Sequence, residues 1–459
     1  MSMFEDIPVD IGIVYEGERI RKSDLLIELG GPKVENKFEL VRVKKPNEVK
    51  DGQIKVVGKD ISEFEEGSSI PIGILIEVTG KQVEEELEGV IERRIHEYGN
   101  YIEGFMHLNQ RYDIWMRLGK RSYEKGLNSF KIIGKVLFRL FKSELPFIES
   151  MQVTFITDPK KVEEMSKEAM KIYEARDARA RKLKDDDVNE FYGCDLCQSF
   201  APTHVCTITP QRYANCGAIS WFDGRAAARI DPKGPIYQIE KGECIDPFKG
   251  EYSGINENAK KKSLGEINRV WLYSAFGYPH TSCGCFEAIA FYIPEVDGLG
   301  VVHRDFQGKT VNALPFSTMA DSTAGGRQVD GFHGLSIEYM RSPKLLQVDG
   351  GWNKIVWMPK VMKERLADYI PKDVIDKIAI EDDVSSIDEL KEFLKSKDHP
   401  VVEGWKELTF EEEVPEEEIS IETTSPAIGV PIAGGGFKII LKDAKIHAKK
   451  IIIRTPKKK

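Results

Sequence analysis

The stretch FYGCDLCQSFAPTHVCTITPQRYANC, residues 191–216, places four of the chain's seven cysteines in one short segment. Four closely spaced thiolates fit either a tetrahedral zinc ion or a 4Fe-4S cluster. The spacing does not distinguish a zinc site from an iron-sulfur site. Only one C-x-x-C pair is present, whereas a zinc ribbon normally has two, and the cysteine run typical of bacterial ferredoxins is also absent. We therefore expect a metal-centred domain here. The four residues are Cys194, Cys197, Cys206 and Cys216.

A second cysteine motif, Thr281-Ser282-Cys283-Gly284-Cys285, follows further along the chain. A C-G-C tripeptide can offer one metal two thiolates and two backbone amide nitrogens, and the central glycine lets the turn aim both amides inward. Such tetragonal nitrogen and sulfur donors favour Ni(II) or Cu(II) over zinc, and nickel suits a reducing cytoplasm better. The same two sulfurs can also bridge to a second metal. Together the two motifs indicate a nickel centre joined to the four-cysteine site.

The composition argues against several other functions. With 66 basic and 75 acidic residues, the chain has no overall positive charge to hold a nucleic acid or an anionic membrane. The longest uncharged stretch, residues 270–286, is too short for a membrane span and contains a proline. The acidic N-terminus is unlike a secretory signal, and an odd number of cysteines argues against a disulfide framework. We expect a cytoplasmic protein. Cys244 falls outside both motifs and is expected to be a buried structural thiol.

Hydrophobic periodicity predicts an α+β or α/β fold. We expect a helix to begin at Thr157-Asp158-Pro159, which combines an N-cap residue with proline at the first helical position. The predicted strands are 11–15, 25–29, 38–43, 53–57, 70–78, 150–156, 269–273, 288–293 and 354–358, and the other predicted helices are 82–96, 127–141 and a pair within 375–397.

We expect two mixed α/β domains and a charged tail. Residues 1–165 form the first domain and are the candidate coenzyme A-binding side, and residues 166–400 carry the metal cluster. Residues 401–459 combine an acidic linker with a basic C-terminal tail. That tail is either a solvated segment or added edge strand, or a docking segment for an acidic partner.

The cysteine spacing, the flanking CDLCQSFAPTHVC and the downstream C-G-C closely resemble acetyl-CoA synthases, in particular the archaeal β subunits of acetyl-CoA decarbonylase/synthase complexes. The resemblance covers about residues 1–400 and includes ISWFDGRAAARIDPKGP (219–235) and DSTAGGRQVDGFHGLS (321–336). It implies a CO-methylating acetyl-CoA synthase, an acyltransferase of one-carbon metabolism and methanogenesis. Such an enzyme reversibly makes acetyl-CoA from carbon monoxide, the methyl group of a methylated corrinoid protein and coenzyme A. The alternative is an iron-sulfur electron-transfer or scaffold subunit without nickel.

The resemblance also implies roles for the individual cysteines. The four cysteines of the first motif would bind a 4Fe-4S cluster, and Cys197 would bridge to a proximal nickel ion. Cys283 and Cys285 would bind a distal nickel ion through both sulfurs and the amides of Gly284 and Cys285, and their sulfurs would bridge to the proximal one. Phe200 matches the aromatic residue that gates the carbon monoxide pocket in the family; an ordinary core phenylalanine is the alternative. The implied catalytic residues are Cys197, Cys283, Cys285 and Phe200.

The stretch NQRYDIWMRLGKRS, residues 109–122, is the densest cationic group of the first domain. Arg111, Arg117 and Arg121 are our candidates for binding the phosphates of coenzyme A. A solvated helix face is the alternative reading of this stretch. His204 and His280 are either hydrogen-bonding partners of the metal-site sulfurs or members of unrelated core hydrogen bonds. The resemblance further implies partnership with a carbon monoxide dehydrogenase subunit and a methylated corrinoid iron-sulfur protein, with ferredoxin as a further candidate.

Overall fold

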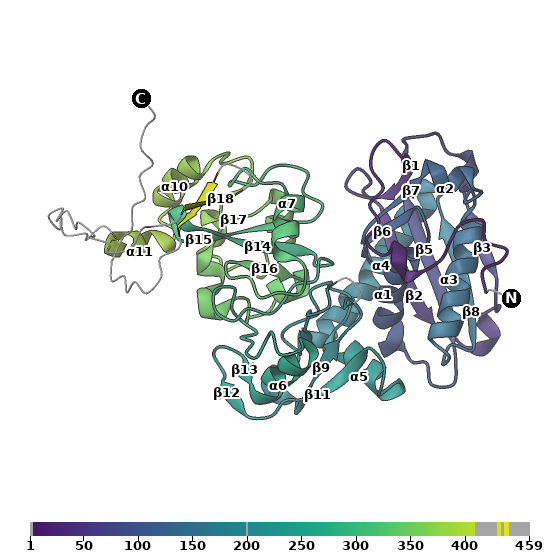
Figure 1. The fold of residues 1–459 in the computed structure, drawn as a ribbon, viewed down its shortest axis with the longest axis horizontal. Coiled ribbons are helices and arrows are strands. Elements are labelled where there is room, and N and C mark those ends of the chain that lie inside the picture. Colours follow the sequence, from purple (N-terminus) through teal and green to yellow (C-terminus); the bar gives the residue numbers. More distant parts are fainter. Residues whose placement is uncertain (1–2, 199–200, 409–428, 433–435, 440–459) are drawn as a thin grey trace. The chain divides into compact units, whose positions relative to one another are not determined.

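Two groups of sheets and helices make up residues 3–408, and Figure 1 shows them in blue and in green. The computed structural model describes residues 3–198, 201–408, 429–432 and 436–439. We call residues 3–180 the N-terminal lobe and residues 185–408 the C-terminal lobe. The mixture of helices with several sheets confirms the predicted fold class. Within the described residues, none of the helices has the length and apolar character needed to cross a membrane.

The N-terminal lobe contains two four-stranded sheets. Their strands are β1 (Leu25–Gly30), β2 (Lys37–Val43), β3 (Ile54–Val57), β4 (Ser69–Ile70), β5 (Ile72–Thr79), β6 (Phe105–Gln110), β7 (Asp113–Gly119) and β8 (Ser150–Ile156). One sheet has the order β4-β1-β7-β6, in which β6 and β7 form an antiparallel hairpin. The other has the order β2-β5-β8-β3, in which β2 and β5 are parallel and β5 and β8 are antiparallel.

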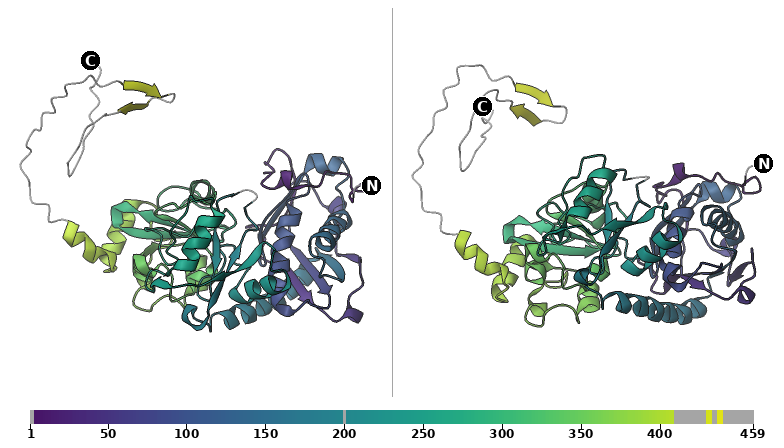
Figure 2. Two further views of the ribbon diagram at one scale, coloured as in Figure 1. Left: turned by 60° about the horizontal axis from the view of Figure 1, so that its bottom comes forward. Right: turned by 90° about the horizontal axis from the view of Figure 1, so that it is seen from below.

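Helices cover these two sheets. They are α1 (Glu88–Gly99), α2 (Lys120–Glu124), α3 (Phe130–Glu144) and α4 (Pro159–Ala180). As predicted, α4 begins after Asp158, whose side chain accepts a hydrogen bond from the backbone N–H of Lys161 at 2.9 Å. This helix packs against β2 and β5 (Figure 2). Its buried residues Val162, Ala169 and Tyr173 lie in one apolar cluster with residues of β2.

The C-terminal lobe is built on smaller sheets, with the orders β10-β9-β11, β12-β13 and β16-β14-β15-β17. Its strands are β9 (Glu190–Cys194), β10 (Cys206–Ile208), β11 (Ile236–Glu240), β12 (Cys244–Asp246), β13 (Glu251–Tyr252), β14 (Ala288–Ile293), β15 (Gly298–His303), β16 (Phe332–Leu335) and β17 (Ile355–Trp357). Its helices are α5 (Trp221–Ile230), α6 (Ser253–Lys262), α7 (Phe316–Thr323), α8 (Ile337–Met340), α9 (Lys360–Leu366), α10 (Ile387–Ser396) and α11 (Val401–Leu408).

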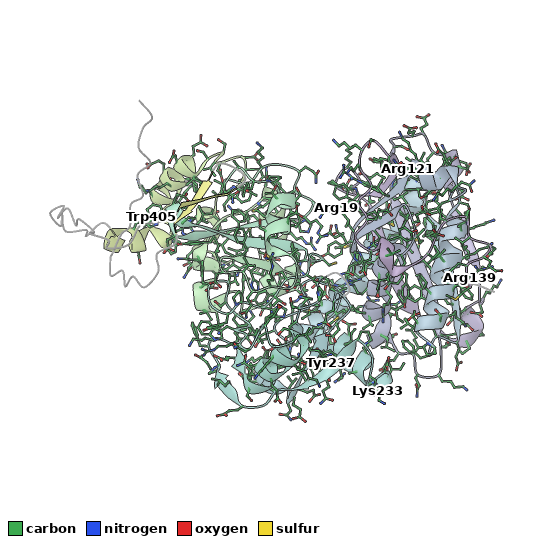
Figure 3. All side chains as sticks on the ribbon, in the orientation of Figure 1. Arg19, Arg121, Arg139, Lys233, Tyr237 and Trp405 are labelled. Atoms are coloured by element: carbon green, nitrogen blue, oxygen red, sulfur yellow. The ribbon has the colours of Figure 1, made fainter. Side chains whose placement is uncertain are left out.

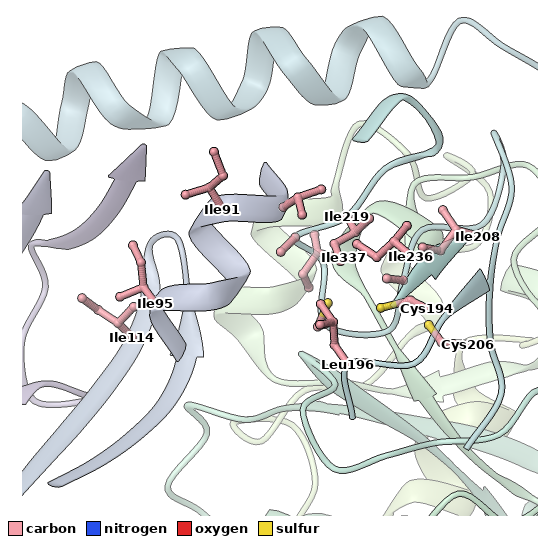
Figure 4. Packing of buried hydrophobic residues seen from close by; sticks show 14 of the residues in the cluster. Ile91, Ile95, Ile114, Cys194, Leu196, Cys206, Ile208, Ile219, Ile236 and Ile337 are labelled. Carbon is pink, nitrogen blue, oxygen red and sulfur yellow. The ribbon is translucent and has the colours of Figure 1, made fainter. Parts of the chain in front are cut away.

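One apolar core runs through both lobes. Ile91 and Ile95 of α1 belong to the same buried cluster as Ile208, Ile219 and Ile236 of the C-terminal lobe (Figure 4). Burying apolar side chains on both sides of the junction holds the lobes together, because the hydrophobic effect scales with the area removed from water. The strands β9 and β10, which carry Cys194 and Cys206, therefore share this core with the N-terminal lobe.

Several predicted elements are wrong or shorter than expected. Residues 13–15 form a 3₁₀ helix instead of a strand, because only Ile11 finds a bridge partner there. The run 269–273 likewise makes a single bridge, from Trp271 to Pro279. Within 375–397 one α-helix forms, α10, beside a short 3₁₀ helix. The cationic stretch 109–122 is mainly the end of the β6–β7 hairpin and not a helix face.

The second unit of the chain comprises residues 409–459. In it the structure describes the antiparallel strands β18 (Gly429–Ile432) and β19 (Gly436–Ile439). The predicted acidic linker and most of the basic tail lie outside the described residues.

A buried ion pair joins α4 to the β6–β7 turn. The guanidinium of Arg111 donates to the carboxylate of Asp177 at 3.2 Å, and both side chains are buried. From the C-terminal lobe, the Tyr213 hydroxyl donates to the same carboxylate at 3.0 Å, and the carbonyl of Gly217 accepts from Arg111 at 3.1 Å. This network holds the segment that carries Cys216 against the N-terminal lobe.

We expect Asp177→Ala to lower the free energy of unfolding by about 3–5 kcal/mol, because it removes the carboxylate that bonds the buried Arg111 guanidinium and leaves it only Glu92, at 3.9 Å. Chemical denaturation measures the change. The matched control is Glu163→Ala, also on α4, which breaks the exposed pair with Lys167 and should cost about 0.5 kcal/mol or less. Equal effects of the two substitutions would contradict the assigned role of the buried pair.

Candidate metal centre

The strand pairing brings the first group of cysteines together. In the antiparallel register of β9 and β10, Cys194 lies directly opposite Cys206, so their side chains are cross-strand neighbours. Cys197 follows β9, and Cys216 precedes Gly217, whose φ of 73° turns the chain. All four side chains line one small enclosed cavity, together with Cys283 and Arg93. The predicted four-cysteine site is thus gathered in space as well as in sequence.

The C-G-C loop lies immediately before β14 and supplies two further thiols. Gly284 has a φ of 135°, in the region that favours glycine, and the backbone N–H of Cys285 points at the Cys283 sulfur at 3.3 Å. The sulfurs of Cys197, Cys283 and Cys285 all lie within 4.8 Å of one another. We call these three residues the three-thiol group. A metal ion bound there would meet sulfur donors from both motifs.

Hydrogen bonds from two other segments hold the C-G-C loop. Arg304, at the end of β15, donates to the carbonyls of Gly284 at 2.5 Å and Phe286 at 2.7 Å. The backbone N–H groups of Gly325 and Gly326 donate to the carbonyls of Cys283 and Ser282, at 3.2 and 2.7 Å. A Cβ at Gly326 would stand 2.4 Å from the backbone nitrogen of His204. Glycine is needed at 326, because it lets the two backbones approach.

The residues on either side of Arg304 bind the other lobe. His303 Nε2 lies 3.1 Å from the carboxylate of Asp113, and Asp305 lies 3.5 Å from the ammonium of Lys37. Burial lowers the pKa of His303, but the neighbouring carboxylate of Asp113 raises it, and the resulting pKa is about 9. The imidazole is therefore cationic at neutral pH, and His303 and Asp113 form an ion pair between the lobes.

Arg93 of α1 projects from the N-terminal lobe into the cysteine cavity. Its side chain is about 1% exposed, Nη2 donates to the Cys197 sulfur at 3.3 Å, and Nη1 has no partner among the described residues. Burial, and then the neighbouring Cys206, raise the pKa of the Cys194 thiol well above its usual range. These thiols ionise only where positive charge offsets their burial. A sulfur-rich cavity with a fixed cation and a free donor fits a buried anionic metal-sulfur cluster.

A larger cavity of about 650 Å³ opens onto the C-G-C loop, a size typical of small-molecule sites. Cationic and aromatic side chains lie along it. Arg117 is among them; it donates to Glu28 at 3.0 Å and stacks over the Trp115 ring at 4.4 Å. The residues that line this cavity include Arg19, His96, Asn100, Trp115, Arg117, Cys283, Gly284, Cys285, Arg304 and Phe316.

The three arginines predicted to bind coenzyme A lie in different surroundings. Arg117 lines the large cavity, whereas Arg111 is buried against Asp177 and does not line it. The side chain of Arg121 is 86% exposed on α2, and it too is absent from the cavity lining (Figure 3). Phe200 lies outside the described residues.

The two histidines singled out from the sequence differ in their surroundings. His280 uses both ring nitrogens within the fold, because Nε2 accepts from the Thr207 N–H and Nδ1 pairs with the Thr281 carbonyl. His204 bonds Thr281 Oγ1 at 2.9 Å and lines the cysteine cavity. His280 is thus a core residue, and His204 faces the sulfurs. Cys244, expected to be buried, is exposed on β12.

The sequence motifs did not indicate Arg93, His96 or Arg304. His96 lies one turn beyond Arg93 on α1, and its Nε2 is 3.5 Å from the Cys285 sulfur. The local signal was the presence of polar residues, among them Arg93 and His96, in a helix whose apolar residues recur at helical spacing. Polar residues on the apolar side of that helix indicate buried polar contacts.

Two family models match the chain. Residues 7–162 match the CO dehydrogenase/acetyl-CoA synthase complex beta subunit, and residues 173–405 match the C-terminal region of the ACS/CODH beta subunit.

Curated relatives are similar over most of the chain. The acetyl-CoA decarbonylase/synthase complex subunit beta of Methanothermobacter thermautotrophicus is 53% identical over 98% of this chain and 100% of that protein. The subunit of the same name from Archaeoglobus fulgidus is 56% identical over 87% of this chain and 76% of that protein. A solved structure of the C-terminal domain of the acetyl-Coenzyme A synthase alpha subunit is 40% identical, covers 26% of this chain and 96% of that one, and has a TM-score of 0.24.

We expect Gly326→Ala to destabilise the protein more than Gly325→Ala. Both glycines have positive φ, so both substitutions strain the backbone. Only at 326 does the new Cβ meet backbone, whereas at 325 its nearest neighbour is an Arg327 side-chain nitrogen at 3.9 Å. The clash should add about 1–3 kcal/mol, measured by chemical denaturation. A smaller cost at 326 than at 325 would show that the close approach to His204 is not required.

Proposed function

This chain belongs to the family of acetyl-CoA decarbonylase/synthase complex beta subunits, and we propose that it assembles and cleaves acetyl-CoA. In the proposed reaction a methyl group from a methylated corrinoid protein, carbon monoxide and coenzyme A combine reversibly, so the chain acts as an acyltransferase. The observation that carries the proposal is the three-thiol group, in which sulfurs from both motifs lie within 4.8 Å of one another at the wall of a large cavity.

We assign the metal ligands as follows. The four cysteines of the first motif, which line the enclosed cavity, would hold a 4Fe-4S cluster, and the three-thiol group with the amides of Gly284 and Cys285 would hold two nickel ions. When bound, these metals supply the soft, electron-rich centre at which carbon monoxide and a methyl group can be joined. Arg93 lines the same cavity, and its Nη1, which has no partner among the described residues, supports an anionic cluster there.

The protein side chains would bind and orient coenzyme A. Arg117 and Arg19 could pair with its phosphates, and the Trp115 ring could stack on the adenine. Arg304 keeps the C-G-C loop fixed while substrates enter, because its guanidinium already bonds two of the loop's carbonyls. The cavity thus brings cationic side chains and the sulfur-bearing loop to one space.

We also propose that the chain works in a multisubunit complex, since its curated relatives are named as complex subunits. A carbon monoxide dehydrogenase subunit would supply carbon monoxide, and a methylated corrinoid iron-sulfur protein would supply the methyl group. Ferredoxin is a further candidate for electron exchange.

We expect Cys283→Ser to remove nickel and activity while leaving the iron-sulfur absorption largely intact, because the four cysteines of the first motif remain. Iron and nickel per chain, with exchange between carbon monoxide and the acetyl carbonyl, measure both effects after anaerobic nickel reconstitution. The control is Cys244→Ser, which removes an exposed thiol outside both motifs. Iron in the wild type without any nickel uptake would instead favour an electron-transfer or scaffold subunit.

We expect Arg117→Gln to raise the KM for coenzyme A about tenfold, equivalent to about 1.4 kcal/mol of lost binding, with a smaller effect on kcat. The glutamine amide can still bond Glu28, so the fold should be preserved. Arg121→Gln is the matched control, because it removes an equal charge outside the cavity. Similar KM values for the two variants would argue against coenzyme A binding along this wall.

A further inference from the structure

Arg212 is a completely buried arginine that lies shortly after β10, with an exposed fraction of 0%. Its Nη2 donates to Asn215 Oδ1 at 3.1 Å and to His333 Nε2 at 2.9 Å. The guanidinium carbon stands 4.3 Å from the centre of the Tyr339 ring. Nε and Nη1 have no hydrogen-bond partner in the described part of the chain. Two of its donors are therefore left unused inside the protein.

The groups that contact this guanidinium carry no negative charge. Asn215 is an uncharged amide. Burial, and then Arg212 itself, lower the pKa of His333 well below its usual range, so this imidazole is neutral. Burial raises the pKa of Tyr339 to about 12, so its hydroxyl keeps its proton at neutral pH. Burial also lowers the pKa of Arg212, but a guanidinium does not lose its proton in proteins. Arg212 is thus a buried cation among neutral groups.

A buried charge without an opposite charge is costly, so buried arginines are usually paired. Arg111 of this chain follows that rule, because Asp177 accepts two of its hydrogen bonds. Arg93 and Arg212 are the least exposed arginines among the described residues, at 1% and 0%, and neither forms an ion pair with a carboxylate there. Both also have unused donors. The exception to the rule therefore occurs twice, and it calls for an anion near each.

Both unpaired arginines stand beside the enclosed cavity of the four cysteines. Arg93 lines that cavity from the N-terminal lobe. On the side of the C-terminal lobe, Asn215 lines it, and Arg212 lies directly behind Asn215 through their hydrogen bond. A charge inside a protein is felt over several ångströms, because the interior screens it much less than water does. The cavity is therefore the place where an anion would balance both cations.

We propose that Arg212 is a fixed counter-charge for the cluster held by the four cysteines and that it raises the reduction potential of that cluster. A 4Fe-4S cluster bound by four thiolates is an anion overall, and the charge around it helps to set its potential. The positive charge of Arg212 favours the reduced state, which is the more negative one. The electron comes from an external one-electron reductant, and no bond forms or breaks. This proposal rests on the proposed function and adds a residue that acts on the cluster without touching substrate.

The first test is Arg212→Gln in the full chain reconstituted with iron, sulfide and nickel. The cluster is titrated with reduced viologen dyes and followed by its visible absorption. We expect the ratio of reduced to oxidised cluster at a fixed potential to fall about tenfold, which corresponds to a midpoint potential lower by about 59 mV. The control is Arg229→Gln on α5, an exposed arginine paired with Glu84, whose charge is screened by water and salt. A wild-type ratio in Arg212→Gln would overturn the proposal.

Arg212→Lys separates the charge from the hydrogen bonds, because lysine keeps the charge but lacks the planar fork and the stacking. We expect a ratio of reduced to oxidised cluster within about twofold of the wild type. A tenfold fall in this variant would show that the contacts of the guanidinium matter and its charge does not, which would overturn the proposal. The same comparison with the wild type decides the question if Arg212→Gln does not fold.

A second measurement compares iron-loaded and iron-free chains by chelator challenge and chemical denaturation. Without iron the Arg212 cation has no anion to balance, so Arg212→Gln should not lower the denaturant midpoint of the iron-free chain. With iron, the chelator should remove the cluster about tenfold faster from the variant. A lower midpoint without iron, together with unchanged iron release, would show that Arg212 serves the fold alone. A wild-type chain that binds iron but forms no acetyl-CoA would contradict the proposed function, whereas the redox titration would still decide the role of Arg212.

Discussion

A buried thiolate persists only where positive charge lies beside it, and this constraint governs how the whole chain is arranged. The cysteines belong to the C-terminal lobe, yet the Arg93 guanidinium that reaches the Cys197 sulfur comes from α1 of the N-terminal lobe. The apolar core shared by the lobes and the Arg111–Asp177 pair keep that guanidinium in place. The proposed metal centre therefore depends on both lobes, although its sulfurs come from one.

The sequence predicted the features that depend on neighbouring residues. The strands 25–29, 38–43 and 288–293 follow from apolar alternation, the start of α4 from its capping residue, and the sulfur sites from cysteine spacing. It could not predict Arg93, His96 or Arg304, because their roles depend on contacts between segments far apart in the chain. Local charge density also gave no sign that Arg111 is buried, since the carboxylate with which it pairs lies on another element.

The sheet β16-β14-β15-β17 explains how a flexible motif such as C-G-C is kept in one geometry. Because β14 and β15 are antiparallel, the start of one lies beside the end of the other, and Ala288 pairs with His303. Arg304 thereby reaches back to the loop before β14. The glycine pair at 325–326 closes the loop from its other side. Regular pairing thus confers rigidity on residues that have no secondary structure of their own.

The alternation of His303, Arg304 and Asp305 has an evolutionary consequence. His303 and Asp305 contact Asp113 and Lys37 of the N-terminal lobe, whereas Arg304 between them contacts the C-G-C loop, so one short segment joins the lobe to the loop. A substitution at 113 or 37 would shift this segment and so the sulfur loop. Positions 113 and 37 should therefore change together with positions 303 and 305 among homologues, although none of these four positions lies in a cysteine motif.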